Sequence, residues 1–272
     1  MLVMGSAAGV IRDRWTQRLR RVGGCLLDAW LPATCIVCGG SGDGALCAAC
    51  EAALPGYAVA RCPCCGLLAP ATSAATSAAT SAATPAATPT ATRCAGCEAD
   101  PPPFGHTVVL ADYAPPLDRV VHALKFGREA SLARPLGRSL ARCLARTIAG
   151  HDGGAAVLTA IPLSLPRLAA RGFNQSLEIA RAIAGAQRLR LDHRLLQRTR
   201  AGAPAATMHA QQRRLALAGA FVAPRRLDGC TVIVVDDVMT TGATLRAAAA
   251  ALTGAGAAHV INCVVARTAH PD

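Results

Sequence analysis

Eight of the thirteen cysteines in this 272-residue chain fall into four C-x-x-C pairs. This spacing puts two thiolates on one side of a tight turn, and two such turns facing each other supply the tetrahedral sulfur ligands that Zn²⁺ accepts. The pairs are Cys35 with Cys38, Cys47 with Cys50, Cys62 with Cys65, and Cys94 with Cys97. We therefore predict two structural zinc sites, one held by the first two pairs and one by the last two.

Some features of these sites stay open at the level of sequence. Interleaved pairing of the C-x-x-C turns is an alternative, and Cys64, next to Cys65, is an alternative ligand. Gly39 and Gly66 each follow a C-x-x-C pair, where a residue that readily takes a positive φ lets backbone N–H groups turn toward sulfur. Because protein ligands fill all four positions of each site, we expect the sites to be structural rather than catalytic.

A low-complexity tract separates the third and fourth pairs. Residues 71–92 contain only Ala, Thr, Ser and Pro, and most of them form an S-A-A-T repeat. Without these 22 residues, the loop between Cys65 and Cys94 shortens from 28 residues to 6 (28 − 22), close to the 8 residues between Cys38 and Cys47. We predict an ordinary second ribbon with a disordered insertion, because loop-closure entropy rises only slowly with loop length.

The charge balance favours an anionic partner. The chain has 28 Lys and Arg residues against 16 Asp and Glu residues, a net charge of +12, and Lys125 is its single lysine. Such a surplus favours phosphates, nucleic acid or an acidic membrane surface as partners. A GC-rich genome is an alternative explanation for the preference of Arg over Lys.

The first thirty residues predict a basic amphipathic helix. No run of eighteen apolar residues occurs, and Asp28 interrupts the apolar stretch near the N-terminus. We therefore expect no transmembrane segment, no secretion signal and a cytoplasmic location. Binding of this helix to a membrane surface through Trp15 and Trp30 is an alternative to packing against the next domain.

After Pro101–Pro103, the cysteine pairs stop and apolar strands alternate with helical stretches. We expect strands over 108–113, 156–161, 231–235 and 259–265, and helices over 116–126, 131–149, 174–186 and 241–255. Strands separated by helices of ten or more residues imply βαβ crossovers. The fold class is therefore α/β, with a mostly parallel sheet flanked by helices.

The most informative segment is Ile233–Thr244, with the sequence I-V-V-D-D-V-M-T-T-G-A-T. A β-branched run ends in Asp236 and Asp237, and a short loop then opens an Ala-rich helix. At the carboxyl end of a parallel strand, the free N–H groups of the following helix bind anions. Two carboxylates beside an anion site would repel the anion unless they accept hydrogen bonds from hydroxyls, such as those of a ribose, or bind Mg²⁺. The segment resembles the motif with which type I phosphoribosyltransferases bind phosphoribosyl pyrophosphate (PRPP).

Two further stretches accompany this motif. One is A-L-K-F at Ala123–Phe126, followed by L-A-R-P-L-G at 132–137, and the other runs from I-P-L at Ile161 to R-G-F-N-Q at 171–175. Together with the paired cysteines, they make residues 31–268, apart from the insertion, resemble the ComF/GntX family of competence-associated, phosphoribosyltransferase-like proteins.

The resemblance implies two parts, which follow the basic helix expected at 1–30, and a set of roles. The two parts are a double zinc ribbon at 31–100 and a type I phosphoribosyltransferase-like domain at 104–272. Asp236 and Asp237 would contact the ribose hydroxyls. The 5-phosphate would bind at Thr240, Thr241, Gly242, Ala243 and Thr244.

The pyrophosphate would lie at the loop after Ile161. A departing pyrophosphate also needs fixed positive charge where its own charge develops. The candidates that supply this charge are Lys125, Arg167 and Arg171. The alternative for each is a solvated cation on a helix face. The motif fixes neither a general base nor an acceptor, so whether catalysis occurs stays open.

We therefore expect a protein that binds PRPP or a related 5-phosphoribosyl group with Mg²⁺, in addition to two structural zinc ions. The family implies a role in DNA uptake during natural transformation. The alternative is a non-catalytic protein that handles single-stranded DNA and keeps the fold for nucleotide sensing. A third hypothesis is an adaptor that docks helicase or recombination proteins.

Overall fold

The computed structural model describes residues 34–40, 46–69, 92–148, 156–199, 217 and 219–269. The chain forms two compact units, Met1–Cys50 and Glu51–Asp272. The basic helix predicted over residues 1–30 lies outside the described residues, and so does the low-complexity insertion up to residue 91. The division between the units falls after the second C-x-x-C pair, so the first two pairs and the last two pairs belong to different units.

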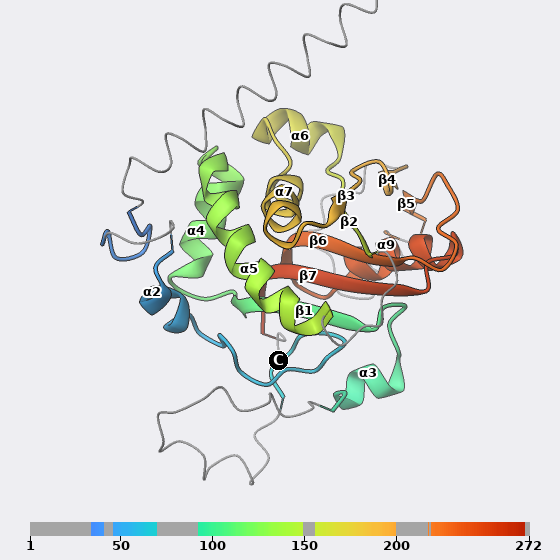
Figure 1. Ribbon diagram of the computed structural model, residues 1–272, viewed down its shortest axis with the longest axis horizontal. Helices are drawn as coiled ribbons and strands as arrows, with labels where there is room; N and C mark the ends of the chain where they lie inside the picture. Colours follow the sequence, from blue (N-terminus) through green and yellow to red (C-terminus); the bar gives the residue numbers. More distant parts are fainter. Residues whose placement is uncertain are drawn as a thin grey trace, which may run out of the picture. The chain divides into compact units, whose positions relative to one another are not determined.

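A five-stranded parallel sheet organises the unit Glu51–Asp272 (Figure 1). In spatial order its strands are β1 (His106–Asp112), β7 (His259–Arg267), β6 (Thr231–Met239), β2 (Ala156–Ala160) and β3 (Arg190–Leu191). A separate antiparallel pair consists of β4 (Gln197–Arg198) and β5 (Phe221–Val222). The predicted α/β class with a mostly parallel sheet is confirmed.

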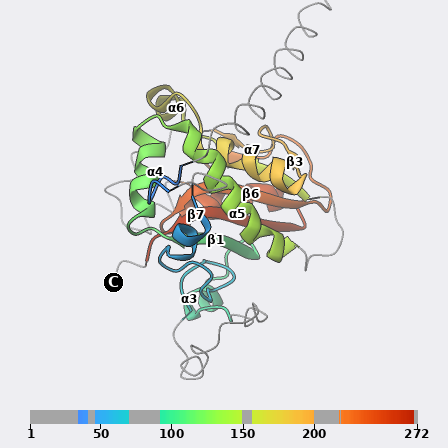
Figure 2. The ribbon, with the colours of Figure 1, turned by 60° about the vertical axis from the view of Figure 1, so that its left-hand side comes forward.

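Helices cover both faces of this sheet, with α5 and α7 on one face (Figures 1 and 2) and α9 on the other (Figure 1). The longer helices are α4 (Leu117–Phe126), α5 (Ala133–Ile148), α6 (Leu165–Arg171), α7 (Gln175–Gln187) and α9 (Ala243–Gly254), and the 3₁₀ turn η1 (Ala130–Leu132) precedes α5. Two short helices are α2 (Ala48–Ala52), which spans the division between the units, and α3 (Ala95–Ala99). Among the described residues, no helix combines the length and the apolar character needed to cross a membrane.

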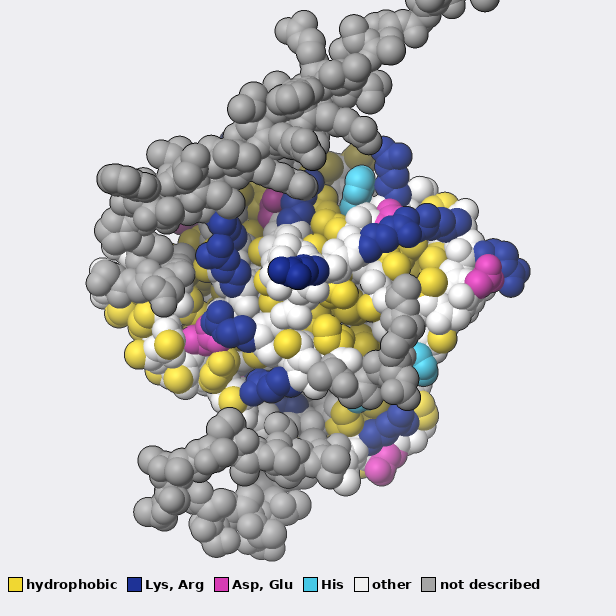
Figure 3. Space-filling view, viewed as in Figure 1, with side chains coloured by type: hydrophobic (Ala, Val, Ile, Leu, Met, Phe, Trp, Pro, Cys, Tyr) yellow, Lys and Arg dark blue, Asp and Glu magenta, His cyan; other side chains and the backbone are white. Residues whose placement is uncertain are grey.

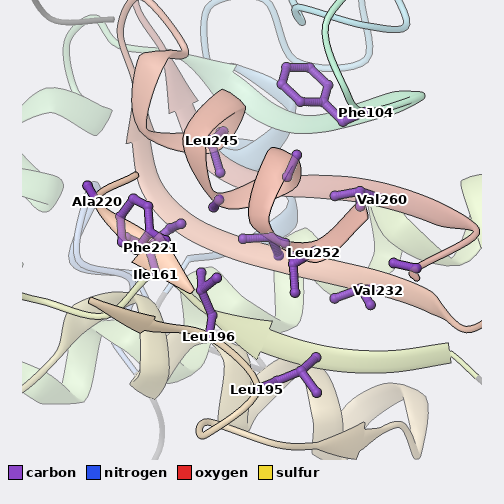
Figure 4. Close-up of a cluster of buried hydrophobic side chains, with 14 of the residues drawn as sticks. Phe104, Ile161, Leu195, Leu196, Ala220, Phe221, Val232, Leu245, Leu252 and Val260 are labelled. Carbon is purple, nitrogen blue, oxygen red and sulfur yellow. The ribbon is translucent and has the colours of Figure 1, made fainter. Parts of the chain in front are cut away.

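Side chains alternate between the two faces of the sheet along β6. Val232 and Val234 pack with Leu245 and Leu252 of α9 in one buried cluster (Figure 4). Ile233 lies between the two valines and therefore points to the opposite face, where it is fully buried. Each fully buried Leu or Ile contributes roughly 1.5–3 kcal/mol. This core fixes the strand from which the candidate site extends.

The predicted strands and helices of the α/β domain are present. The short strands β3, β4 and β5 were not predicted, and two further differences concern α6 and the end of β6. The strand continues through Asp236 and Asp237 to Met239, whereas the sequence predicts its end at Val235. β2 ends opposite Val235, so β6 is paired beyond that point only with β7. The short α6 was not predicted, because apolar periodicity is recognised over windows of about 11–18 residues and α6 has only 7 residues.

The segment around the third C-x-x-C pair covers the outer edge of β1. Thr107 N donates a hydrogen bond to Pro63 O (2.7 Å), and Asp112 N donates one to Pro55 O (2.8 Å). An unpaired strand edge can pair with a strand of another chain. These hydrogen bonds use polar groups on the edge of β1 that would otherwise be open to such pairing. They also anchor this part of the chain to the α/β domain.

Basic side chains are spread over the surface (Figure 3). The face seen in this view shows more Lys and Arg than Asp and Glu, in keeping with the 28 basic and 16 acidic residues of the whole chain. Such a surface favours anionic partners through long-range attraction that salt weakens.

Candidate functional site

The cysteines form two tetrads, within each of which the four Sγ atoms lie within 4.8 Å of one another. The first tetrad consists of Cys35, Cys38, Cys47 and Cys50, and the second of Cys62, Cys65, Cys94 and Cys97. The C-x-x-C pairs are therefore combined in sequence order and are not interleaved.

The sulfur spacing fits a tetrahedral zinc ion. With Zn–S bonds of about 2.3 Å, neighbouring sulfurs of a tetrahedron lie about 3.8 Å apart. Cys38 Sγ and Cys47 Sγ are 3.8 Å apart, and Cys65 Sγ and Cys94 Sγ are 3.6 Å apart. Both tetrads thus have the ligand type, number and spacing of structural zinc sites.

Backbone N–H groups favour the thiolate form of one cysteine in each tetrad. Burial alone would raise the pKa of the Cys62 thiol, but hydrogen bonds from the backbone N–H groups of Cys94, Cys65 and Cys64 outweigh it and lower the pKa to about 7. A similar balance lowers the pKa of Cys35 to about 6. Since metal binding releases the thiol proton, a lowered pKa favours zinc at neutral pH.

Cys64 lies outside the second tetrad. It is fully buried, and its Sγ donates to Gly105 O at 3.6 Å, directly before β1. Burial raises the pKa of this thiol. Cys64 therefore acts as a small apolar anchor to the sheet, and the alternative in which it serves as a zinc ligand is not adopted.

A cavity of about 660 Å³ opens at the carboxyl end of β6. Its walls come from the end of α4, from α6, from the end of β6 and from the first turn of α9. Its charged and aromatic lining consists of Lys125, Phe126, Arg128, Arg167, Arg171 and Asp236. Small-molecule sites typically enclose roughly 300–1,000 Å³, so the cavity has the size of a ligand site.

The two adjacent acids have different surroundings. Asp236 lines the cavity, and its Oδ1 accepts a hydrogen bond from Ser176 Oγ at 2.9 Å. Asp237 is only 8% exposed, and its Oδ1 lies 3.2 Å from Lys125 Nζ. Burial raises the pKa of Asp236 to about 7, and repulsion from Asp237 adds to the effect. A strongly perturbed carboxyl in a cavity is typical of a functional site.

Cations outnumber acids in the lining. Among the residues that the structure describes, four Lys and Arg side chains and one Asp line the cavity, a net charge of +3 (4 − 1) when Asp236 is ionised. Arg171 is held in place, because its Nη1 donates to Gln175 Oε1 at 3.0 Å and its guanidinium lies 5.4 Å from the centre of the Phe126 ring. The lining therefore suits a ligand with several negative charges.

The loop after β6 leads directly into α9. Gly242 is the N-cap residue of this helix and has a φ of 76°, in the left-handed region that favours glycine. Ala243 N donates to Thr241 Oγ1 at 3.4 Å, and the other first-turn N–H groups have no partner within the helix. All five residues from Thr240 to Thr244 line the cavity. The loop therefore offers N–H groups and hydroxyls to an anion.

Most of the residues predicted for the site meet at this cavity. Lys125, Arg167, Arg171 and Asp236 line it together with the loop 240–244. The residues between Ile161 and α6 do not line it, and α6 itself does. The roles that the sequence assigns to these residues stay predictions.

Sequence reasoning missed three contributors. Arg128 and Phe126 line the cavity at the end of α4, and Ser176 binds Asp236 from the first turn of α7. For two of them the sequence held a signal, since Phe126 ends the A-L-K-F stretch and Ser176 directly follows the R-G-F-N-Q stretch. Arg128 carries no such signal in a chain where almost every cation is an Arg.

Two family models match the chain. Residues 175–271 match the phosphoribosyl transferase domain, and residues 26–82 match the double zinc ribbon domain. The second match ends before Cys94 and Cys97, which the structure brings to the second tetrad from beyond the insertion. The fold and the tetrads thus define a phosphoribosyltransferase-like α/β protein with a double zinc ribbon.

Curated relatives narrow this class. DNA utilization protein YhgH of Escherichia coli O6:H1 is 34% identical over 178 residues, which cover 64% of this chain and 78% of that protein. YhgH of Salmonella typhi is 33% identical over the same length. The chain belongs to the ComF/GntX family. Among solved structures, the crystal structure of TT1426 from Thermus thermophilus is 18% identical, with 52% of this chain and 84% of that chain covered and a TM-score of 0.31, a likeness that carries no argument.

Proposed function

We propose that this protein binds PRPP, or a related 5-phosphoribosyl group, with Mg²⁺ in the cavity at the end of β6. One observation carries the proposal: among the described residues, an anion-binding loop, the carboxyl of Asp236 and four cations line the same cavity. A phosphorylated sugar with a pyrophosphate group requires all three at once. A strand and a helix that serve only the fold require none of them.

Each group has one task in this proposal. The loop 240–244 holds the 5-phosphate through its N–H groups and hydroxyls. Asp236 accepts hydrogen bonds from ribose hydroxyls, and Asp237 holds Lys125 at the wall through their ion pair. When bound, Mg²⁺ neutralises the pyrophosphate charge. Arg167 and Arg171 add fixed positive charge where pyrophosphate would leave.

The catalytic form of the proposal is glycosyl transfer. An acceptor nucleophile would form a bond to C1 of the ribose while the bond from C1 to pyrophosphate breaks, and the pyrophosphate would carry away the bonding electrons. The non-catalytic form is binding of the same ligand as a nucleotide sensor. Both forms require the same contacts, so binding is the first property to measure.

Isothermal titration of PRPP with Mg²⁺ tests the proposal. Wild type should bind, and Asp236→Asn should weaken binding about 100-fold because it removes a charged acceptor from the ribose. Asp228→Asn is the matched control, since Asp228 is exposed and pairs with Arg226 away from the cavity lining. No binding by wild type would refute the proposal.

A role in DNA uptake, with single-stranded DNA as a partner in the cytoplasm, is a second proposal. It is supported by the name of the relatives, DNA utilization protein, and by the net charge of +12. Helicase or recombination proteins are further partners that the family implies. Fluorescence anisotropy with a single-stranded oligonucleotide should show affinity falling at least about tenfold between roughly 50 and 200 mM salt. An affinity that does not change over this range would argue against direct DNA binding.

A further inference from the structure

Arg267, the last residue of β7, is a buried cation that the proposed binding of the ligand does not use. The residue is only 4% exposed. Burial lowers the pKa of Arg267, and the nearby thiols Cys65, Cys97 and Cys94 oppose that effect when they are ionised. Burial of a guanidinium costs free energy unless its N–H groups have hydrogen-bond acceptors. The acceptors of Arg267 therefore show which parts of the chain it holds together.

The partners of Arg267 lie in two places. On one side Nε donates to Cys65 O at 2.8 Å, a carbonyl within the second tetrad. On the other side Nη1 donates to Met239 O at 3.2 Å and to Thr240 O, where β6 ends and the anion loop begins. Nη1 also donates to Thr268 O at 2.6 Å. One rigid planar group therefore joins the zinc-binding turn to the loop.

A second observation places the same two regions together. A cavity of about 110 Å³ has Cys65, Cys94 and Cys97 on its wall, together with Met239, Thr241 and Gly242 of the loop. Arg267 and Arg246 also line this cavity. Arg246 Nη2 donates to Asp100 O at 2.8 Å and so ties α9 to the chain directly after α3. The tetrad and the anion loop thus face each other across a small space.

The anion loop turns at Gly242, where the backbone conformation favours glycine. A Cβ added at Gly242 would lie 2.6 Å from Met239 Cε, and the backbone of Gly242 has a positive φ. The carbonyls of Met239 and Thr240, which bind Arg267, directly precede this turn. The position of Arg267 therefore influences where the N–H groups of the turn point.

We propose that Arg267 is a positioning residue through which the metal of the second tetrad holds the loop 239–244 in its anion-binding form. With zinc bound, the turn that contains Cys65 is fixed, its carbonyl holds the guanidinium, and the guanidinium holds the loop carbonyls. Without zinc, the Cys65 turn loosens and Arg267 loses that anchor. The consequence for ligand affinity rests on the proposed function, whereas the order of the loop does not.

Hydrogen–deuterium exchange of the loop amides, without any phosphoribosyl ligand, tests this coupling. Arg267→Lys keeps the charge but not the planar set of donors, so exchange of residues 240–244 should rise about tenfold or more, as expected for the loss of a hydrogen bond to a charged group. The matched control is Arg61→Lys. Arg61 also binds a carbonyl beside the second tetrad, Gly66 O at 3.0 Å, but its other partners are Gly56 and Asp112, so the loop exchange should stay unchanged.

Metal dependence is measured in a Cys38→Ser background, where the first tetrad lacks a ligand and metal analysis should give about one zinc per chain. Chelation of the remaining zinc should raise loop exchange when Arg267 is present and should add little in the Arg267→Lys variant. Equal rises in both, or no rise in either, would overturn the proposal. If chelation unfolds the whole unit, the zinc-bound Arg267→Lys protein decides: faster exchange confined to the loop supports the coupling, and unchanged loop exchange overturns it.

Because no ligand is present, this result is independent of PRPP binding. A protein that fails to bind PRPP but shows the zinc-dependent loop would refute the proposed function alone. If the protein binds PRPP but the amide exchange of its loop changes neither with zinc removal nor with Arg267→Lys, only the coupling is refuted.

Discussion

The two cysteine tetrads share one local motif and differ in what surrounds them. In the first, Gly39 has a φ of +70°, and an added Cβ would meet no atom of a described residue within 4 Å. In the second, Gly66 has a φ of +68°, but an added Cβ would lie 2.6 Å from Val109 Cγ2 of β1. Within the described part of the chain, the C-x-x-C turn of the first tetrad therefore serves only to bind zinc. In the second tetrad, the same turn also packs against the α/β domain. The motif predicts the metal, and only the fold shows what the metal supports.

The largest difference should follow the loss of one ligand from each tetrad. Cys97→Ser alters a thiol that is 4% exposed within the unit containing the sheet, and should lower the free energy of unfolding of that unit by on the order of 5 kcal/mol. Cys38→Ser alters an exposed thiol of the other unit and should change the thermal midpoint of the sheet by no more than about 2 °C. Circular dichroism and metal analysis check both. Equal losses of stability would contradict the difference between the tetrads.

A change in the cavity should separate ligand binding from metal binding. Asp236→Asn should lose PRPP affinity about 100-fold while both tetrads keep zinc. Asp237→Asn should have a smaller effect, about tenfold, because Asp237 acts through its ion pair with Lys125. Titration calorimetry with parallel metal analysis measures both. A greater loss in Asp237→Asn than in Asp236→Asn would reverse the roles given to the two acids.

The matched glycines give a finer test. Gly39→Ala should cost about 1 kcal/mol, because only the positive φ opposes the new side chain. Gly66→Ala meets the same strain and also a close contact with Val109, so it should cost about 2–3 kcal/mol. Chemical denaturation of each unit measures the two costs. If the costs are the same, the second ribbon does not pack against β1 as described.

The smallest effect concerns pH and distinguishes the sheet-containing unit. Asp236 has its pKa raised from 3.8 to about 7, so between these values the folded protein holds a proton that the unfolded chain has lost. Its free energy of unfolding should therefore fall as pH rises from about 4 to about 7 and then level off, by about 1–2 kcal/mol once partial exposure of the carboxyl is considered. Asp236→Asn should remove this fall. Denaturation at about pH 4, 6 and 8 checks the slope, and a rise in the Asp236 contribution with pH would contradict its raised pKa.

Much of the fold could be predicted because the sequence carries local signals for it. The C-x-x-C spacing predicts both tetrads, and the strands with their crossover helices predict the sheet. The predicted end of β6 was wrong because pairing with β7 continues past Val235, and no local signal shows where a neighbouring strand ends. α6 was missed because its 7 residues are too few for an apolar period to be recognised.

The candidate site was predicted in part for similar reasons. The loop 240–244 and Asp236 form a contiguous motif, so they could be recognised from the chain alone. The burial of Asp237 against Lys125 and the bond from Ser176 to Asp236 join residues far apart in the sequence. Arg267 could not be singled out, because the chain is rich in Arg and only the fold shows that this one is buried between a zinc-binding turn and an anion loop.

A crystal structure of the full chain with PRPP and Mg²⁺ is the most direct test of the proposed function. The account predicts density for the 5-phosphate at the N–H groups of residues 240–244, with the ribose hydroxyls at Asp236. Well-diffracting crystals with saturating ligand and an empty cavity, or with the phosphate bound elsewhere, would contradict it.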